Sequence, residues 1–139
     1  MNKVLIIEDE VSTAEAVQSA LAMDDIYADI APDGKSGVEA FTSGNYDLVL
    51  LDLKMPGLSG EEVLAAIRKI DPFIDVIIYT NYSEFADIKK LANIGIDGYI
   101  NKGPKADLAE LIAAIKEKLA PLSDETISEL LKDVPSSED

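Results

Sequence analysis

The sequence contains neither cysteine nor histidine among its 139 residues. Without cysteine there is no disulfide framework, no thiolate zinc site and no cysteine nucleophile. Without histidine there is no Ser-His or Cys-His catalysis, no imidazole metal ligand and no phosphohistidine chemistry on this chain itself. Any chemistry must therefore use carboxylates, hydroxyls, lysines or a hard metal ion.

Basic residues are scarce as well, with 12 Lys and Arg against 27 Asp and Glu and a net charge of −15. This charge repels nucleic acid and anionic membranes, so we expect direct binding to neither. No apolar run approaches the roughly 20 residues of a membrane span. The N-terminal MNKVLIIEDE is too short and too acidic for a signal peptide, and we expect a soluble, cytoplasmic protein.

Short apolar segments alternate with segments of helical periodicity along most of the chain. We expect strands at 3–8, 26–31, 46–52, 75–80 and 97–101, and helices at 13–23, 35–42, 60–69, 84–93 and 104–119. Buried strands joined by helical crossovers predict an α/β fold, namely a doubly wound five-stranded parallel sheet in the flavodoxin-like order 2-1-3-4-5 with helices on both faces.

The ends of the expected elements carry further signals. Ser12 with Glu15, and Ser59 with Glu62, have the spacing of capping boxes that open helices. We expect residues 1–120 to form one domain. Residues 121–139 are then an acidic C-terminal extension, with a short helix followed by a disordered end.

Polar side chains follow the expected strands where each strand ends. Glu8 and Asp9 follow the first strand and Asp52 ends the third, its neighbour in the sheet, so three carboxylates should converge. Unpaired carboxylates repel one another, and Mg²⁺ resolves that conflict because it prefers carboxylate oxygens and water. Thr80 ends the fourth strand and Lys102 follows the fifth, and a hydroxyl and an ammonium beside acids suit a phosphoryl group.

The motifs IIEDE, LLDLKMPGLSG, YTNYSE and DGYINKGPK, spread over residues 3–119, resemble the chemotaxis-type receiver domain of two-component response regulators. The resemblance implies a phosphorylation-dependent signalling switch. Such a protein is a regulatory phosphoacceptor and not an enzyme, and its only expected reactions are self-phosphorylation from a phosphodonor and autodephosphorylation. It implies that Asp52 accepts a phosphoryl group from a histidine kinase or phosphotransfer protein. The implied ligands of Mg²⁺ are Glu8, Asp9, Asp52 and the backbone carbonyl of Lys54.

The resemblance also implies roles around the phosphate. Lys102 would pair with it, Thr80 would donate its hydroxyl, and Tyr99 would be the switch aromatic that turns inward. The surface of the fourth helix, fifth strand and fifth helix would then change to regulate a downstream protein or an output domain. A phosphorylation-dependent dimer is compatible with this scheme.

The chain departs from the family pattern at two places. Receivers usually follow this lysine with a proline after a cis peptide, whereas here Gly103 follows Lys102. Asn81 stands after the threonine where small residues are common. We expect Asn81, Tyr82 and Gly103 to tune access to the phosphate or the lifetime of the phosphorylated form.

Other function classes are compatible with parts of this pattern. A degenerate receiver would act as a phosphorylation-independent binding module, although such modules usually lack the Asp, Thr or Lys present here. An aspartyl-phosphate phosphatase of the haloacid-dehalogenase type would carry an Asp-x-Asp signature. In this chain the residue two positions after Asp52 is Lys54 and not a second aspartate. A nucleotide-binding domain is disfavoured because neither glycine-rich phosphate-binding motif occurs.

Overall fold

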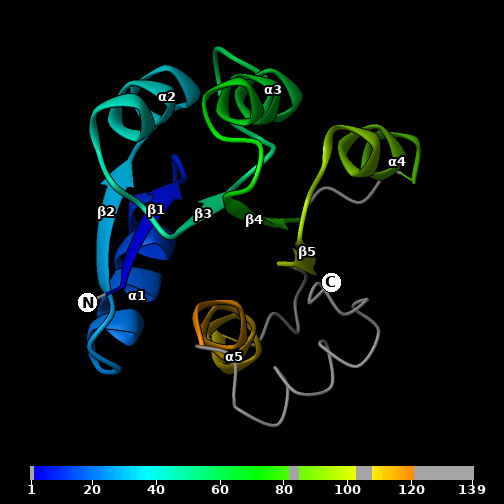
Figure 1. The fold of residues 1–139 in the computed structure, drawn as a ribbon. Helices are drawn as coiled ribbons and strands as arrows, with labels where there is room; N and C mark the ends of the chain where they lie inside the picture. Colours follow the sequence, from blue (N-terminus) through cyan, green and yellow to red (C-terminus); the bar gives the residue numbers. More distant parts are fainter. Residues whose placement is uncertain (1, 82–84, 103–107, 121–139) are drawn as a thin grey trace, which may run out of the picture.

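The computed structural model describes residues 2–81, 85–102 and 108–120, in which helices and strands alternate (Figure 1). The elements are β1 (Lys3–Ile7), α1 (Val11–Ala22), β2 (Tyr27–Ala31), α2 (Gly34–Ser43), β3 (Leu48–Leu51), α3 (Gly60–Ile70), β4 (Asp75–Thr80), α4 (Phe85–Ile94), β5 (Gly98–Asn101) and α5 (Leu108–Leu119). The acidic extension at 121–139 lies outside the described residues.

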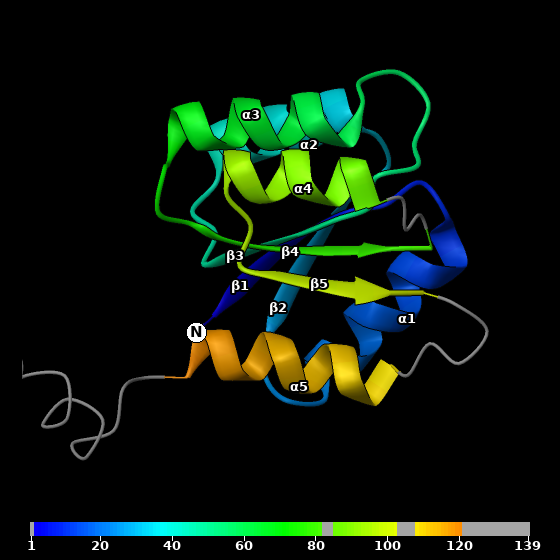
Figure 2. The ribbon, with the colours of Figure 1, turned by 90° about the vertical axis from the view of Figure 1, so that its right-hand side faces the viewer.

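The five strands form one parallel sheet in the order β2-β1-β3-β4-β5, which confirms the predicted order. Helices α2, α3 and α4 cover one face and α1 and α5 cover the other (Figures 1 and 2). Side chains alternate between two apolar clusters, so Val4 and Ile6 pack with α1 and α5 whereas Leu5 and Ile7 pack with α2 and α3. Both faces of the central strands are buried, and Val4–Ile7 of β1 and Leu48–Leu51 of β3 are therefore continuously apolar.

The central strands end side by side. Ile7 of β1 lies opposite Leu51 of β3, and the Asp52 amide donates to the Ile7 carbonyl at 3.0 Å. The Glu8 amide donates to the Ala31 carbonyl of β2 at 3.0 Å. The strand expected at 46–52 is shorter than predicted, and Asp52 is the first residue beyond β3. Backbone hydrogen bonds thus fix the residues that directly follow β1 and β3.

The two predicted capping boxes have different outcomes. At α3 the box is present, because the Glu62 amide donates to Ser59 Oγ and the Ser59 amide donates to Glu62 Oε1, each at 3.1 Å. At α1 the prediction is wrong, because the helix begins at Val11 with Glu10 as the N-cap and no side chain caps it. Helical bonding begins when the Ala14 amide donates to the Glu10 carbonyl, which places Ser12 inside the helix.

Within the described part of the chain, no helix has both the length and the apolar character needed to cross a bilayer. Among the described helices, the longest are α1 and α5 with 12 residues each, well below the roughly 20 that a span requires.

Ser59→Ala should lower the free energy of unfolding by about 1 kcal/mol, because the Glu62 amide loses its capping acceptor. Urea unfolding followed by circular dichroism measures this change. The matched control is Ser19→Ala at an exposed position inside α1, which should stay within about 0.5 kcal/mol of the parent. Equal losses in the two variants would contradict a capping role for Ser59.

Candidate functional site

Three carboxylates meet at the carboxyl edge of the sheet. Glu8 and Asp9 follow β1, Asp52 follows β3, and each offers an oxygen within 4.8 Å of the other two. Glu8 and Asp52 are only 4% and 5% exposed, while Asp9 is open to solvent. The structure therefore brings together the acids that the sequence predicted would converge, with two buried and one at the surface.

Backbone amides hold one oxygen of each buried acid. The Lys54 amide donates to Asp52 Oδ1 and the Glu10 amide donates to Glu8 Oε2, both at 3.2 Å. The Lys54 side chain itself is exposed. Because these donors belong to the loops directly after β3 and β1, the carboxylates are oriented by the chain that leaves each strand.

Lys102 follows the edge strand β5, and its side chain reaches the same cluster of acids. Its Nζ donates to Glu8 Oε1 and lies 3.3 Å from Asp52 Oδ2. Its amide donates to the Thr80 carbonyl at 2.8 Å, which ties the end of β5 to the end of β4. One ammonium therefore contacts two buried carboxylates that follow two different strands.

The protonation of this cluster is perturbed. Burial, together with the hydrogen bond and the charge of neighbouring Asp52, raises the pKa of Glu8 to about 7 against the opposing effect of Lys102. For Lys102, burial works to lower the pKa, but the hydrogen bond to Glu8 and the charges of Asp52 and Glu8 outweigh it and raise the pKa above its usual value. Glu8 thus changes its protonation near neutral pH.

The donor set of this cluster fits a hard divalent cation. Three carboxylates within 4.8 Å of one another can supply several oxygens, and exposed Asp9 leaves room for water ligands. Two of the acids share one ammonium, so one cation faces three carboxylates and does not balance their charge. The residues present would therefore accommodate Mg²⁺.

The other predicted residues lie around the cluster. Thr80 is fully buried at the end of β4, and Asn81 after it is exposed. Tyr99 lies in β5 opposite Ile78, half-buried against the apolar cluster beneath α2, α3 and α4, and burial raises its pKa. Tyr82 and Gly103 lie outside the described residues.

One contact of the site was missed from the sequence. Lys102 Nζ lies over the ring of Tyr79, 5.2 Å from its centroid. In the sequence, Tyr79 reads as an ordinary residue of the apolar strand VIIYT. The one feature of the sequence that could have indicated this contact is the position of Tyr79. It directly precedes Thr80, so its side chain lies on the face of the sheet opposite to that of Thr80.

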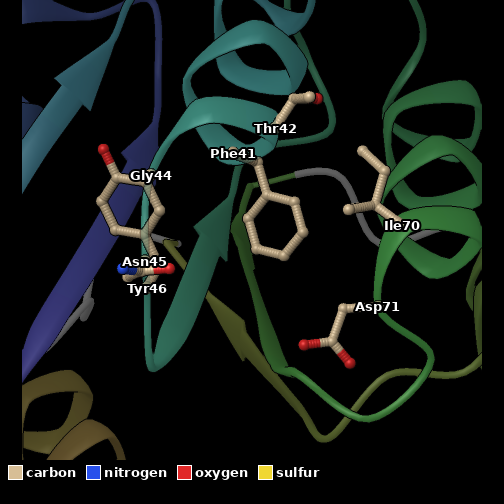
Figure 3. A pocket seen from close by; sticks show the side chains of 7 residues that line it. All are labelled: Phe41, Thr42, Gly44, Asn45, Tyr46, Ile70 and Asp71. Carbon is tan, nitrogen blue, oxygen red and sulfur yellow. The ribbon is translucent and has the colours of Figure 1, made fainter.

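A separate hollow of about 230 Å³ lies between the C-terminal ends of α2 and α3. Its lining residues are Phe41, Thr42, Gly44, Asn45, Tyr46, Ile70 and Asp71. Figure 3 shows Phe41 from α2 and Ile70 from α3 on its walls. Helices in this fold run opposite to the strands, so the hollow lies at the amino edge of the sheet, away from the acids.

Comparison with known proteins gives a consistent assignment. Residues 4–116 match the family model of the response regulator receiver domain. The transcriptional regulatory protein DltR of Streptococcus agalactiae is 40% identical over 114 residues, which cover 82% of this chain and 50% of DltR. This chain spans about half the length of the curated relatives it matches.

Solved structures agree with the family match. A CheY-like receiver domain protein from Methanospirillum hungatei has a TM-score of 0.81 at 26% identity, with 93% of this chain and 98% of that chain covered. TrrA from Thermotoga maritima, solved with Mg²⁺-BeF, has a TM-score of 0.74 at 34% identity, with 85% and 99% covered. TrrA was also solved in complex with the histidine kinase ThkA, with a TM-score of 0.75 at 33% identity and 86% and 100% covered. With its sheet order and acid cluster, this chain belongs to the response regulator receiver domain family.

Proposed function

We propose that this chain is a phosphorylation-dependent switch in which Asp52 accepts a phosphoryl group from a histidine kinase or a phosphotransfer protein. The observation that carries the proposal is the contact of Lys102 Nζ with Glu8 and Asp52, within a cluster of three carboxylates. A buried carboxylate beside a cation and two further acids suits phosphoryl transfer, where positioning and charge do most of the work.

In the proposed step, a carboxylate oxygen of Asp52 attacks phosphorus in line with the leaving group. The new O–P bond forms as the donor's bond to phosphorus breaks, so a phosphohistidine releases its imidazole and acetyl phosphate releases acetate. No proton has to leave Asp52, because an ionised carboxylate is already the nucleophile. Hydrolysis removes the phosphoryl group from Asp52. Water attacks phosphorus, the Asp52 carboxylate is regenerated, and inorganic phosphate is released.

The surrounding residues have separate tasks in this proposal. The Lys102 ammonium, 3.3 Å from Asp52 Oδ2, neutralises charge on the phosphoryl oxygens, and Thr80 at the neighbouring strand end donates its hydroxyl to them. Glu8, Asp9, Asp52 and the Lys54 carbonyl would hold Mg²⁺. When bound, the ion would supply further positive charge to the phosphoryl oxygens.

The readout is proposed to lie on the surface of α4, β5 and α5. Tyr99 is half-buried in β5, so a movement of Thr80 toward the phosphate would open space for its ring to turn inward. This surface would then regulate a downstream partner, an output domain or a second copy of the chain. The complex of TrrA with ThkA supports a histidine kinase as the phosphodonor. The cytoplasmic location of this chain stays a prediction.

Acetyl phosphate with Mg²⁺ should raise the intact mass of the protein by one phosphoryl group, because the acid cluster can activate a small donor. Asp52→Asn should reduce this labelling to background, since an amide is a poor nucleophile. The matched control is Asp47→Asn, an exposed acid just before the other end of β3, which should label like the parent. Undiminished labelling of Asp52→Asn would refute the assignment.

Mg²⁺ affinity should rise between about pH 6 and pH 8 and then level off. Glu8 has a pKa raised to about 7, so at lower pH its proton competes with the ion, and at higher pH the free carboxylate binds it. Isothermal titration calorimetry across this range measures the dependence. Glu8→Gln should bind more weakly and with a flatter pH profile; an equally steep profile in that variant would show that another group is responsible.

A further inference from the structure

Tyr79 makes a contact with the site that packing alone does not require. Its ring centroid lies 5.2 Å from Lys102 Nζ, within the roughly 6 Å over which an ammonium is attracted to an aromatic face. Tyr79 is 7% exposed and the Lys102 side chain 15%, so water screens this attraction little. The contact joins the cation of the site to the residue directly before Thr80.

The topology explains why Lys102 needs support. Lys102 follows β5, and β4 and β3 lie between β5 and β1 in the sheet. To reach Glu8 after β1, its side chain must cross the end of β4, where Tyr79 lies opposite Ile100. Ile100 packs on the same face of the sheet as Tyr79, and Lys102 stands two residues further along. The Tyr79 ring therefore lies beneath the path of the lysine.

A purely space-filling role describes Tyr79 less well. Although it belongs to the apolar cluster with α1 and α5, it also borders a hollow of about 240 Å³. The hollow is lined by Ser12, Thr13, Ala16, Val17, Tyr79 and Leu108. Packing within that cluster does not account for the face of its ring, over which the Lys102 ammonium lies 5.2 Å from the centroid.

We propose that Tyr79 is a positioning residue, whose aromatic face holds the Lys102 ammonium over the end of β4 and toward Glu8 and Asp52. The ring face and not the hydroxyl performs this task. The lysine is thereby restricted before a phosphoryl group arrives, and less conformational entropy is lost when it pairs with the phosphate. The effect on phosphate binding rests on the proposed function. The contact between Lys102 and the Tyr79 ring does not, because it is present without a phosphoryl group.

The first test is nuclear magnetic resonance of the metal-free protein. A ring beneath the lysine should move the ε-methylene protons of Lys102 upfield of those of exposed lysines such as Lys89, and Lys102→Arg assigns the signal by its disappearance. Tyr79→Phe should keep the shift and Tyr79→Leu should lose it. An unshifted Lys102 signal in the parent protein overturns the inference, whether or not the variants fold.

The second test measures binding of beryllofluoride with Mg²⁺, an anionic mimic of the phosphoryl group. Losing a desolvated cation–π contact corresponds to a roughly 5- to 30-fold change in an equilibrium constant, so Tyr79→Leu should weaken binding by about that factor. Tyr79→Phe should stay within about twofold. Ile77→Val removes volume from the same face of β4 without contacting Lys102, and it should also bind like the parent.

A double-mutant cycle separates positioning from general loss of structure. In a Lys102→Ala background, Tyr79→Leu should change beryllofluoride affinity by less than about twofold, because the cation it positions is gone. A full-sized loss in that background would show that Tyr79 acts through folding alone. If the parent protein fails to bind beryllofluoride, the proposed function fails, while the Lys102 proton shift still decides the role of Tyr79.

Discussion

The structure depends on placing like charges together at one edge of a buried sheet. Glu8 and Asp52 are almost fully buried, and a buried charge without a partner costs on the order of several kcal/mol. Lys102 offsets part of that cost by contacting both acids, while burial and the nearby Asp52 carboxylate still raise the pKa of Glu8. The remaining negative charge would favour a divalent cation, which the proposed phosphoryl transfer to Asp52 would use. The close acids lower the stability of the fold, while the proposed function requires them. Lys102 contributes to both, because it partly neutralises the buried acids and would pair with the phosphoryl group.

The parallel sheet supplies the rigidity that this arrangement needs. The amides of Asp52 and Glu8 extend the backbone bonding of β3 and β1 by one residue, so each acid begins where its strand ends. Apolar clusters on both faces fix the strands in place. Lys102 is tied to Thr80 through the backbone and lies on the ring of Tyr79. Residues that follow four of the five strands, or end them, are thus held at one edge before any ligand binds.

Much of the fold followed from sequence patterns, because buried parallel strands and amphipathic helices have distinct periodicities. The sheet order was predicted from the alternation of strands and helices, and the convergence of Glu8, Asp9 and Asp52 from their positions at strand ends. The start of α1 was wrong because Ser12 has the spacing of a cap, whereas the chain already turns at Glu10. Tyr79 was missed because strand periodicity tells which face a residue occupies but not that a lysine from β5 will cross it. Such contacts depend on side-chain paths between strands that are distant in sequence.

The central claim is that Asp52, and no other acid in the cluster, forms the covalent bond to phosphorus. Borohydride reduces an aspartyl phosphate to homoserine and leaves free carboxylates unchanged, so peptide mass spectrometry after reduction locates the modified residue. After treatment with acetyl phosphate and Mg²⁺, we predict homoserine at position 52, with Asp9 intact and Glu8 unreduced. Reduction at Asp9 or Glu8 in place of Asp52, or a phosphoryl group that survives borohydride on a hydroxyl, would contradict the account.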